Sequence, residues 1–375
     1  MMHIGLQNLK RDPMRVMIAI AGIVFSVVLV TLEVGLLSGL MRNASLMIDS
    51  SRADLWISAK DTPTIDFSTP FGARKKYQIE AVPGVEKVED FSLSFSAWKL
   101  PNGTFMNVQI AGLDVHGDLR PAINLVEGSL SDLSLQDAII IDRGDRAKLG
   151  NPNLGDVADI YNHRAKIVGF TENMKSFTTS PYVFTSQRNF QKFSLMGRED
   201  KPISLLVKVK DGESVARVRE AIAASVTGIE VQTRAGFSSR TRNYWLIETG
   251  MGIGFLAAAM LGLLVGGVIV SQTLYAMTVE KIPEFAVLKA MGASMAELAF
   301  VVLEQGFICG TVGVMLGLVV SKILAAMALR AGTTIELSIP LIALVGTVTL
   351  LLCSAASLAS VLRLRKVEPA MVFRA

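Results

Sequence analysis

Few ionisable residues lie within or beside the long apolar stretches of this chain. The carboxylates Glu33, Glu248 and Glu304 lie within or beside long apolar stretches. Glu33 follows Val16 by 17 residues, which is about 25 Å along a helix at ~1.5 Å per residue. Ionisable groups in lipid are costly, and they usually face a cavity or a partner. Each carboxylate is therefore expected either to line a substrate path or to lie at a wetted interface, and Glu304 could equally cap a packing contact.

No known catalytic pattern accompanies these carboxylates. His116 and His163 are each isolated from other metal-ligand types. The G-x-S-x-G, H-E-x-x-H and G-x-x-x-x-G-K-[ST] motifs do not occur. The two cysteines, Cys309 and Cys353, lie in apolar stretches and do not form a disulfide framework. We therefore expect no catalytic residue, no metal site and no enzymatic activity in this chain.

The composition indicates a membrane protein. Apolar residues make up 51% of the 375 residues and charged residues 19%, below the ~25% charge of ordinary globular domains. Mean hydropathy is +0.45. The net charge of +4 is small and no long basic run occurs, which argues against nucleic-acid binding.

Four apolar stretches are each long enough to span a bilayer, which takes ~20 residues. They cover residues 16–41, 246–278, 298–329 and 339–362. The predicted fold is an α-helical membrane protein with one plus three transmembrane helices and a large α/β domain inserted after the first. The remaining segments are the N-terminus 1–15, the inserted domain 42–245, the connection 279–297, the short loop 330–338 and the tail 363–375.

The basic residues next to these helices predict the orientation. They are Lys10, Arg11 and Arg15 before the first helix, and Arg363, Arg365, Lys366 and Arg374 after the last. Lys and Arg concentrate in short cytoplasmic segments. Both termini and the connection 279–297 are therefore expected to be cytoplasmic, with the inserted domain and the loop 330–338 outside.

The inserted domain is expected to bind or dock a partner. Asn102-Gly103 predicts a hairpin between extended runs at 85–100 and 104–113. The run 138–142 (AIIID) predicts a buried strand, and 213–225 has the apolar spacing of a helix.

Small residues four apart recur in three of the helices. The pairs considered for helix packing or for a dimer interface are Gly35 with Gly39, Gly250 with Gly254, and Gly306 with Gly310. Such spacing lets helix backbones approach closely in lipid. Packing within the four-helix unit and contact between subunits both remain open.

The connection between the second and third helices carries the strongest pattern, TVEKIPEFAVLKAMGASMAE. Pro283 and Glu284 suit the first turn of a helix. Gly292 is a suitable stop, and Ser294 a suitable cap for the next helix. Three residues at helical spacing form an apolar stripe with no cytoplasmic domain to cover it, namely Phe285, Leu288 and Met291. The stripe is expected to enter a partner's groove or to rest in lipid headgroups.

The segment PEFAVLKAMGAS resembles the coupling segment of the MacB/FtsX/LolC-type ABC permeases, commonly REIGxLRAxGAS. Six positions match: Glu284, Leu288, Ala290, Gly292, Ala293 and Ser294. The departures include Pro283 and Lys289 in place of arginine and Ala286 in place of glycine. The segment, the first helix and the closing 367–370 (VEPA) look most like the DevC branch.

The resemblance implies the transmembrane permease subunit of a type VII (MacB-like) ABC exporter in the bacterial inner membrane. Two permease copies would form a dimer, each contacting a separate ATPase through Pro283, Glu284, Phe285, Leu288, Lys289, Met291 and Gly292. ATP and Mg would be bound by that ATPase, so this chain would hold no cofactor. The outer domain would dock a periplasmic membrane-fusion adaptor beneath a TolC-like outer-membrane duct, and mechanotransmission would export a lipophilic substrate such as a glycolipid taken from membrane lipid.

Two alternatives remain open at this point. An FtsX-like signalling subunit would activate a periplasmic partner without transport. An exporter of haem or another amphiphile would share the same layout.

Overall fold

The computed structural model divides the chain into two compact units. One comprises Met1–Gly39 and Gly252–Ala375, and the other comprises Leu40–Met251. The structure describes residues 12–178, 180–196, 201–330 and 333–364. Several predicted features lie outside these residues: Lys10, Arg11, Arg365, Lys366, Arg374 and the segment 367–370.

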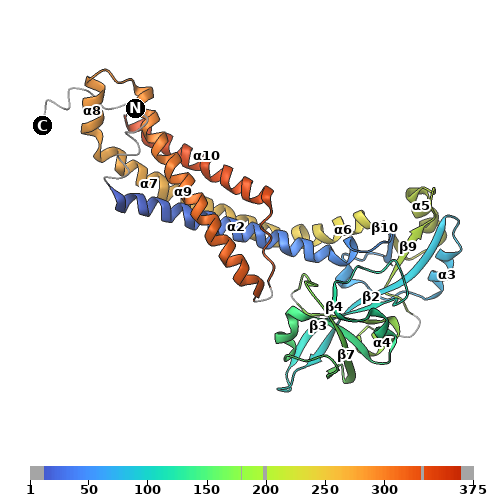
Figure 1. Ribbon diagram of the computed structural model, residues 1–375. Coiled ribbons are helices and arrows are strands. Elements are labelled where there is room, and N and C mark those ends of the chain that lie inside the picture. The colour runs from blue at the N-terminus through green and yellow to red at the C-terminus, as the bar shows by residue number, and fades with distance from the viewer. Residues whose placement is uncertain (1–11, 179, 197–200, 331–332, 365–375) are drawn as a thin grey trace. The chain divides into compact units, whose positions relative to one another are not determined.

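The helical unit contains long apolar helices that run alongside one another (Figure 1). They are α2 (Pro13–Asp49), α7 (Met251–Glu280), α9 (Met295–Arg330) and α10 (Ile339–Leu364), with the short α8 (Ile282–Ala290) between α7 and α9. In the described residues, four helices are long and apolar enough to cross a membrane. Their shared core includes Ile23, Val27, Val270, Cys309 and Cys353, all of which are fully or almost fully buried.

Two helix boundaries differ from the sequence prediction. Helix α2 continues to Asp49, past the predicted end at Met41, because its last turns bury Met47 and Ile48 in the core of the α/β unit. The predicted start of the second spanning helix at Leu246 falls instead in a π-helical turn, η4 (Tyr244–Glu248). Gly250 follows with a φ of 72° and separates this turn from α7, because glycine adopts positive φ without strain.

The α/β unit is built on a mixed sheet. Its strands are β1 (Leu55–Ala59), β2 (Val85–Lys99), β3 (Phe105–Leu113), β4 (Leu125–Gly128), β5 (Ala138–Asp142), β6 (Val157–Ile160), β7 (His163–Thr171), β8 (Tyr182–Ser186), β9 (Ser204–Val209) and β10 (Ile229–Thr233). The sheet order is β10-β1-β9-β2-β3-β8-β5-β7-β4, and β6 pairs with β2 and β7. Most neighbours are antiparallel, but β3–β8 and β5–β7 are parallel.

Short helices lie between the strands along the chain, and several of them are labelled in Figure 1. They are η1 (Ile65–Phe67), α3 (Arg74–Glu80), η2 (Leu130–Ser134), η3 (Arg143–Leu149), α4 (Gln187–Phe193), α5 (Val215–Ser225) and α6 (Arg234–Asn243). Helix α5 buries Val218 and Ile222 in the same cluster as Leu55 and Val207 of the sheet. The predicted helical spacing of α5 is therefore confirmed.

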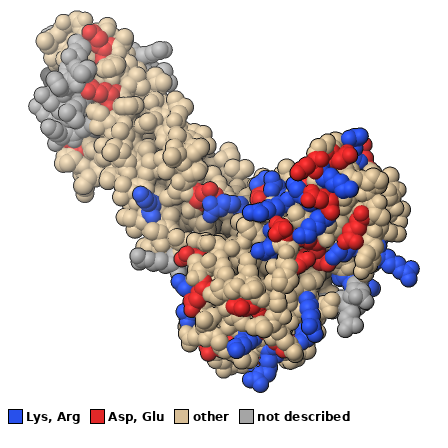
Figure 2. Space-filling view, turned by 45° about the vertical axis from the view of Figure 1, so that its right-hand side comes forward, with Lys and Arg blue, Asp and Glu red and all other residues tan. Residues whose placement is uncertain are grey.

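The local strand predictions are also confirmed. The β2–β3 hairpin turns at Asn102-Gly103, where Gly103 has a φ of 84°, and β5 coincides with AIIID. Charged side chains are spread over the visible face of the α/β unit and are sparse on the visible face of the spanning helices (Figure 2). This contrast reflects the different solvents that the two units meet, because an exposed charge is costly in lipid and inexpensive in water.

Candidate functional site

The predicted coupling segment forms the helix α8. Pro283 lies in its first turn, where the missing N–H costs little, and Glu284 complements the positive end of the helix. Gly292, with a φ of 98°, follows the helix. The Ser294 hydroxyl accepts a hydrogen bond from the Glu297 N–H at 3.3 Å, while the Glu297 carboxylate accepts one from the Ser294 N–H at 2.8 Å. This capping box begins α9, so the predicted stop and cap are both confirmed.

One face of α8 is covered by the chain itself. Phe285 is 2% exposed and Ala286 is fully buried, in a cluster with Leu298, Val302 and Val361. Leu288 is partly buried against the same cluster. The expectation that the Phe285–Leu288 stripe has nothing to cover it is therefore wrong, because the ends of α9 and α10 supply that cover.

The opposite face of α8 is open in the chain. Pro283, Glu284 and Val287 are exposed, and Met291 just after the helix is 78% exposed. Val287 and Met291 are four residues apart and so share one side of the turn. Lys289 is half-buried. A partner that contacts α8 would meet this second face, which combines an apolar pair with one carboxylate.

Helix α8 is firmly connected to its neighbours. Only Lys281 separates it from the end of α7. At that same end Glu280 pairs with Arg15, so the beginning of α2 is linked to the end of α7. The buried cluster joins α8 to α9 and α10. Helix α8 is therefore joined to α7 by the chain and to α9 and α10 by side-chain packing.

Two of the three glycine pairs, Gly306 with Gly310 and Gly35 with Gly39, lie at close contacts within the helical unit. A Cβ on Gly306 would lie 1.9 Å from the Ser357 Oγ, and one on Gly310 would lie 3.1 Å from Leu350, so these residues allow α9 to approach α10. A Cβ on Gly39 would lie 2.3 Å from the Thr334 carbonyl oxygen. Gly35 accepts a hydrogen bond from the Glu336 N–H at 2.9 Å. Gly35 and Gly39 therefore pack against the segment between α9 and α10 and not against another helix.

The third pair has a different environment. A Cβ on Gly250 or Gly254 would meet nothing within 4 Å, and Gly254 is exposed on α7. The described part of the chain therefore gives this pair no packing role, and its assignment to a dimer interface stays a prediction.

The two carboxylates predicted to meet substrate belong to different units. Glu33 is half-buried on α2 in the helical unit, two residues before Gly35. Glu248 is exposed at the end of η4 in the α/β unit. Their roles as substrate contacts remain predictions.

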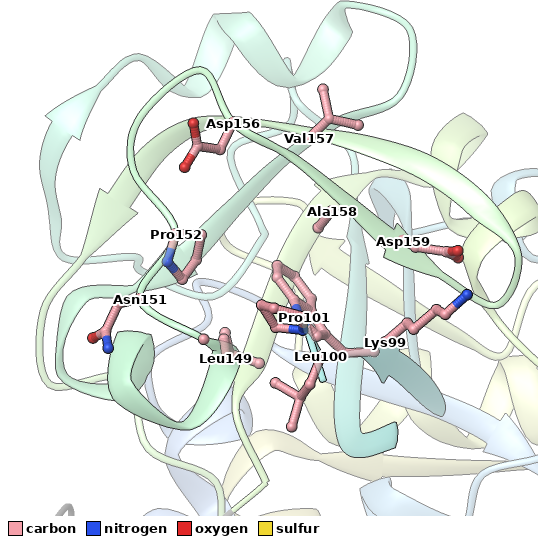
Figure 3. A pocket seen from close by; sticks show the side chains of 12 residues that line it. Lys99, Leu100, Pro101, Leu149, Asn151, Pro152, Asp156, Val157, Ala158 and Asp159 are labelled. Atoms are coloured by element: carbon pink, nitrogen blue, oxygen red, sulfur yellow. The ribbon is translucent and has the colours of Figure 1, made fainter. Parts of the chain in front are cut away.

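A hollow of about 430 Å³ lies in the α/β unit near the β2–β3 hairpin. Figure 3 shows Leu100, Pro101 and Leu149 along it, with Lys99 and Asp159 on neighbouring strands at one side and Asp156 at the other. Mixed charge around an apolar surface suits contact with a polypeptide. Within the described ranges, no group of three or more His, Cys, Asp or Glu residues could hold a metal ion.

Sequence reasoning missed a buried carboxylate in the α/β unit. Asp66 on η1 is 7% exposed; its Oδ1 accepts a hydrogen bond from the Gln109 Nε2 at 2.9 Å, and its Oδ2 accepts one from the Thr64 Oγ1 at 3.2 Å. Burial raises the pKa of the Asp66 carboxyl above its usual value, against these hydrogen bonds. Burial also raises the pKa of the neighbouring Tyr182, with a smaller contribution from Asp66. The local sequence TPTIDFSTP carries no signal for this burial, because the cover comes from distant strands.

Family models match both parts of the chain. Residues 16–225 match the MacB-like periplasmic core domain, and residues 256–369 match the FtsX-like permease C-terminal domain. The first match covers more than half of the chain. The chain therefore belongs to the MacB/FtsX-type ABC transporter permeases, as the coupling segment predicted, and the one-plus-three layout with an inserted α/β domain is the fold of this class.

Individual relatives are distant. An uncharacterized ABC transporter permease of Methanocaldococcus jannaschii is 27% identical over 48% of this chain and 46% of its own length, so the chain spans less than half of that relative. An uncharacterized ABC transporter permease of Mycobacterium tuberculosis is 24% identical over 100% of this chain and 99% of its own length.

Solved structures of outer domains are also similar to this chain. The periplasmic region of MacB from Actinobacillus actinomycetemcomitans is 13% identical, with a TM-score of 0.37, over 52% of this chain and 96% of that one. The extracellular domain of the noncanonic ABC-type transporter YknZ from Gram-positive bacteria is 12% identical, with a TM-score of 0.36, over 48% of this chain and 99% of that one.

Proposed function

We propose that this permease couples ATP hydrolysis on a separate ATPase subunit to the export of a lipophilic substrate. The observation that carries the proposal is the two-sided α8. Its inner face is fixed to α9 and α10 through Phe285 and Ala286, while Pro283, Val287 and Met291 are exposed. An ATPase that binds the exposed face would move the long helices together, and the α/β unit would receive that movement through α2.

The wider assembly belongs to the same proposal. Two permease copies in the inner membrane, with both termini in the cytoplasm, would each contact one ATPase, which holds ATP and Mg. The α/β unit would dock a membrane-fusion adaptor and, through it, a TolC-like duct, as in the DevC branch that the coupling segment resembles. The hollow near the β2–β3 hairpin is a suitable place for an adaptor side chain, because apolar walls there lie between charges of both signs.

A charge placed on the exposed face of α8 tests the coupling. Val287→Arg with Met291→Arg should leave the permease folded, because both side chains are exposed, but should lower co-purification of the ATPase and its permease-dependent ATP hydrolysis at least tenfold. Ala296→Arg is the control: Ala296 is also exposed, but it lies on α9 beyond the turn. Hydrolysis that stays at the unsubstituted level in the double variant would refute the role of α8.

A further inference from the structure

A small pocket adjoins the buried carboxylate of Asp66. It has a volume of about 150 Å³. Its lining residues are Asp66, Phe67, Ser94, Phe95, Leu195 and Met196. The pocket thus combines one carboxylate with two aromatic rings and two aliphatic side chains. Phe67, Leu195 and Met196 are each about half exposed, so the pocket is open to a ligand.

The Asp66 carboxylate has hydrogen bonds but no counter-charge. Its partners Gln109 and Thr64 are neutral, and so is the neighbouring Trp245, whose indole N–H also favours the charged form and lowers the pKa of the carboxyl. No lysine or arginine among the described residues acts on that pKa. The amide group of Gln109 adds a second acceptor, because its Oε1 is buried without a donor among the described residues. A carboxylate removed from water is costly unless it is paired. The site therefore lacks a positively charged hydrogen-bond donor.

The pocket walls favour one kind of cation. Aromatic ring faces attract ammonium groups, and the attraction increases when the cation is desolvated. A hydrogen bond between an ammonium and a carboxylate is about twice as strong as a neutral one. Leu195 and Met196 add apolar surface for the adjoining carbon chain. We propose that this pocket binds the ammonium end of an amphiphilic alkylamine, with Asp66 as its counter-ion. The inference deepens the proposed function, because it gives a chemical class to the lipophilic substrate.

The pocket adjoins an aromatic segment of the α/β unit that precedes α7 in the chain. The ring of Phe67 lies 5.8 Å from that of Trp245 and 6.2 Å from that of Tyr244, between centroids. Trp245 precedes Met251, where α7 begins, by six residues, so it lies within about 20 Å of that end at ~3.5 Å per residue. Tyr and Trp are enriched at membrane–water interfaces.

Two water-soluble probes of equal length test the site. Hexylammonium and 1-hexanol share a six-carbon chain but differ in charge, and binding of each to the purified full-length permease is measured by calorimetry at pH 7.5. Hexylammonium should bind at least tenfold more tightly than hexanol. Asp66→Asn should remove this preference and leave hexanol binding within twofold. Asp211→Asn, at an exposed aspartate outside the pocket, should change neither.

A pH series on the unsubstituted protein supplies a test that does not depend on the folding of a variant. Protonation neutralises Asp66, so the preference for hexylammonium should shrink as the pH falls through the raised pKa of that carboxyl. The adjoining Tyr182 is neutral throughout, since its pKa is raised well above the ordinary value, and Gln109, Thr64 and Trp245 do not titrate.

Three results would overturn the proposal: equal affinities for the two probes, no saturable binding of either, or a preference that survives Asp66→Asn. The assay contains no ATPase, so a failure here is distinguishable from a failure of coupling through α8.

Discussion

Two glycine pairs with the same spacing have opposite environments. Gly306 and Gly310 lie where α9 meets α10, and a Cβ on Gly306 would overlap the Ser357 hydroxyl. Gly250 and Gly254 lie at the start of α7, and a Cβ on either would meet open space. Spacing alone therefore shows that a close approach is possible, but not whether a neighbour is there or which one it is.

The same contrast divides α8. Phe285 and Met291 both belong to the predicted apolar stripe, yet Phe285 is 2% exposed and Met291 is 78% exposed. The first is part of the core at one end of the helical unit, and the second is available to a partner. Stability and coupling should therefore depend on different residues of this one segment.

The largest expected effect is on stability, from the buried side of α8. Phe285→Ala should destabilise the helical unit by about 3–5 kcal/mol, because the substitution removes a large buried side chain and leaves a cavity. Met291→Ala, the exposed counterpart, should change stability by less than ~0.5 kcal/mol. The midpoints of unfolding by denaturant in detergent micelles measure both. Equal destabilisation by the two substitutions would contradict the division of α8 into two faces.

A smaller loss of stability is expected at the packed glycine pair, Gly306 and Gly310. Gly306→Leu should cost about 1–3 kcal/mol, because overpacking forces neighbouring groups to move, and Ser357 would have to move first. Thermal unfolding in detergent checks the loss. Adding Ser357→Gly should recover part of the stability, since it removes the group that clashes; no recovery would show that the α9–α10 contact is not the cause.

The smallest expected effect on stability is at the open pair. Gly254→Leu should alter the stability of one chain by less than ~0.5 kcal/mol, because the added side chain meets no neighbour. If α7 contacts a second permease copy at this position, the same substitution should convert dimers to monomers in size-exclusion chromatography. An unchanged dimer would remove Gly254 from the interface.

Much of the local structure could be predicted from residue types and spacing. The hairpin at Asn102-Gly103, the buried strand AIIID, the capping box at Ser294 and the spanning helices all depend on neighbours within a few residues. The apolar excess and the PEFAVLKAMGAS segment were also sufficient to indicate the family. These features can be predicted because they depend on short-range backbone preferences and on the cost of burying polar groups, both of which are set by residues close together in the sequence.

The tertiary structure alone decided which surfaces are covered. Phe285 is buried because the ends of α9 and α10 lie beside it, and Gly35 and Gly39 pack against the segment before α10. Asp66 is buried because Gln109 and Tyr182 come from strands far along the chain. A side chain is buried by residues that are distant from it in the sequence, so no local sequence pattern reveals its burial. For this permease, the amino-acid sequence alone determined the helices and strands and showed that the protein spans a membrane. Long-range packing determined which side chains remain exposed to contact a partner or a ligand.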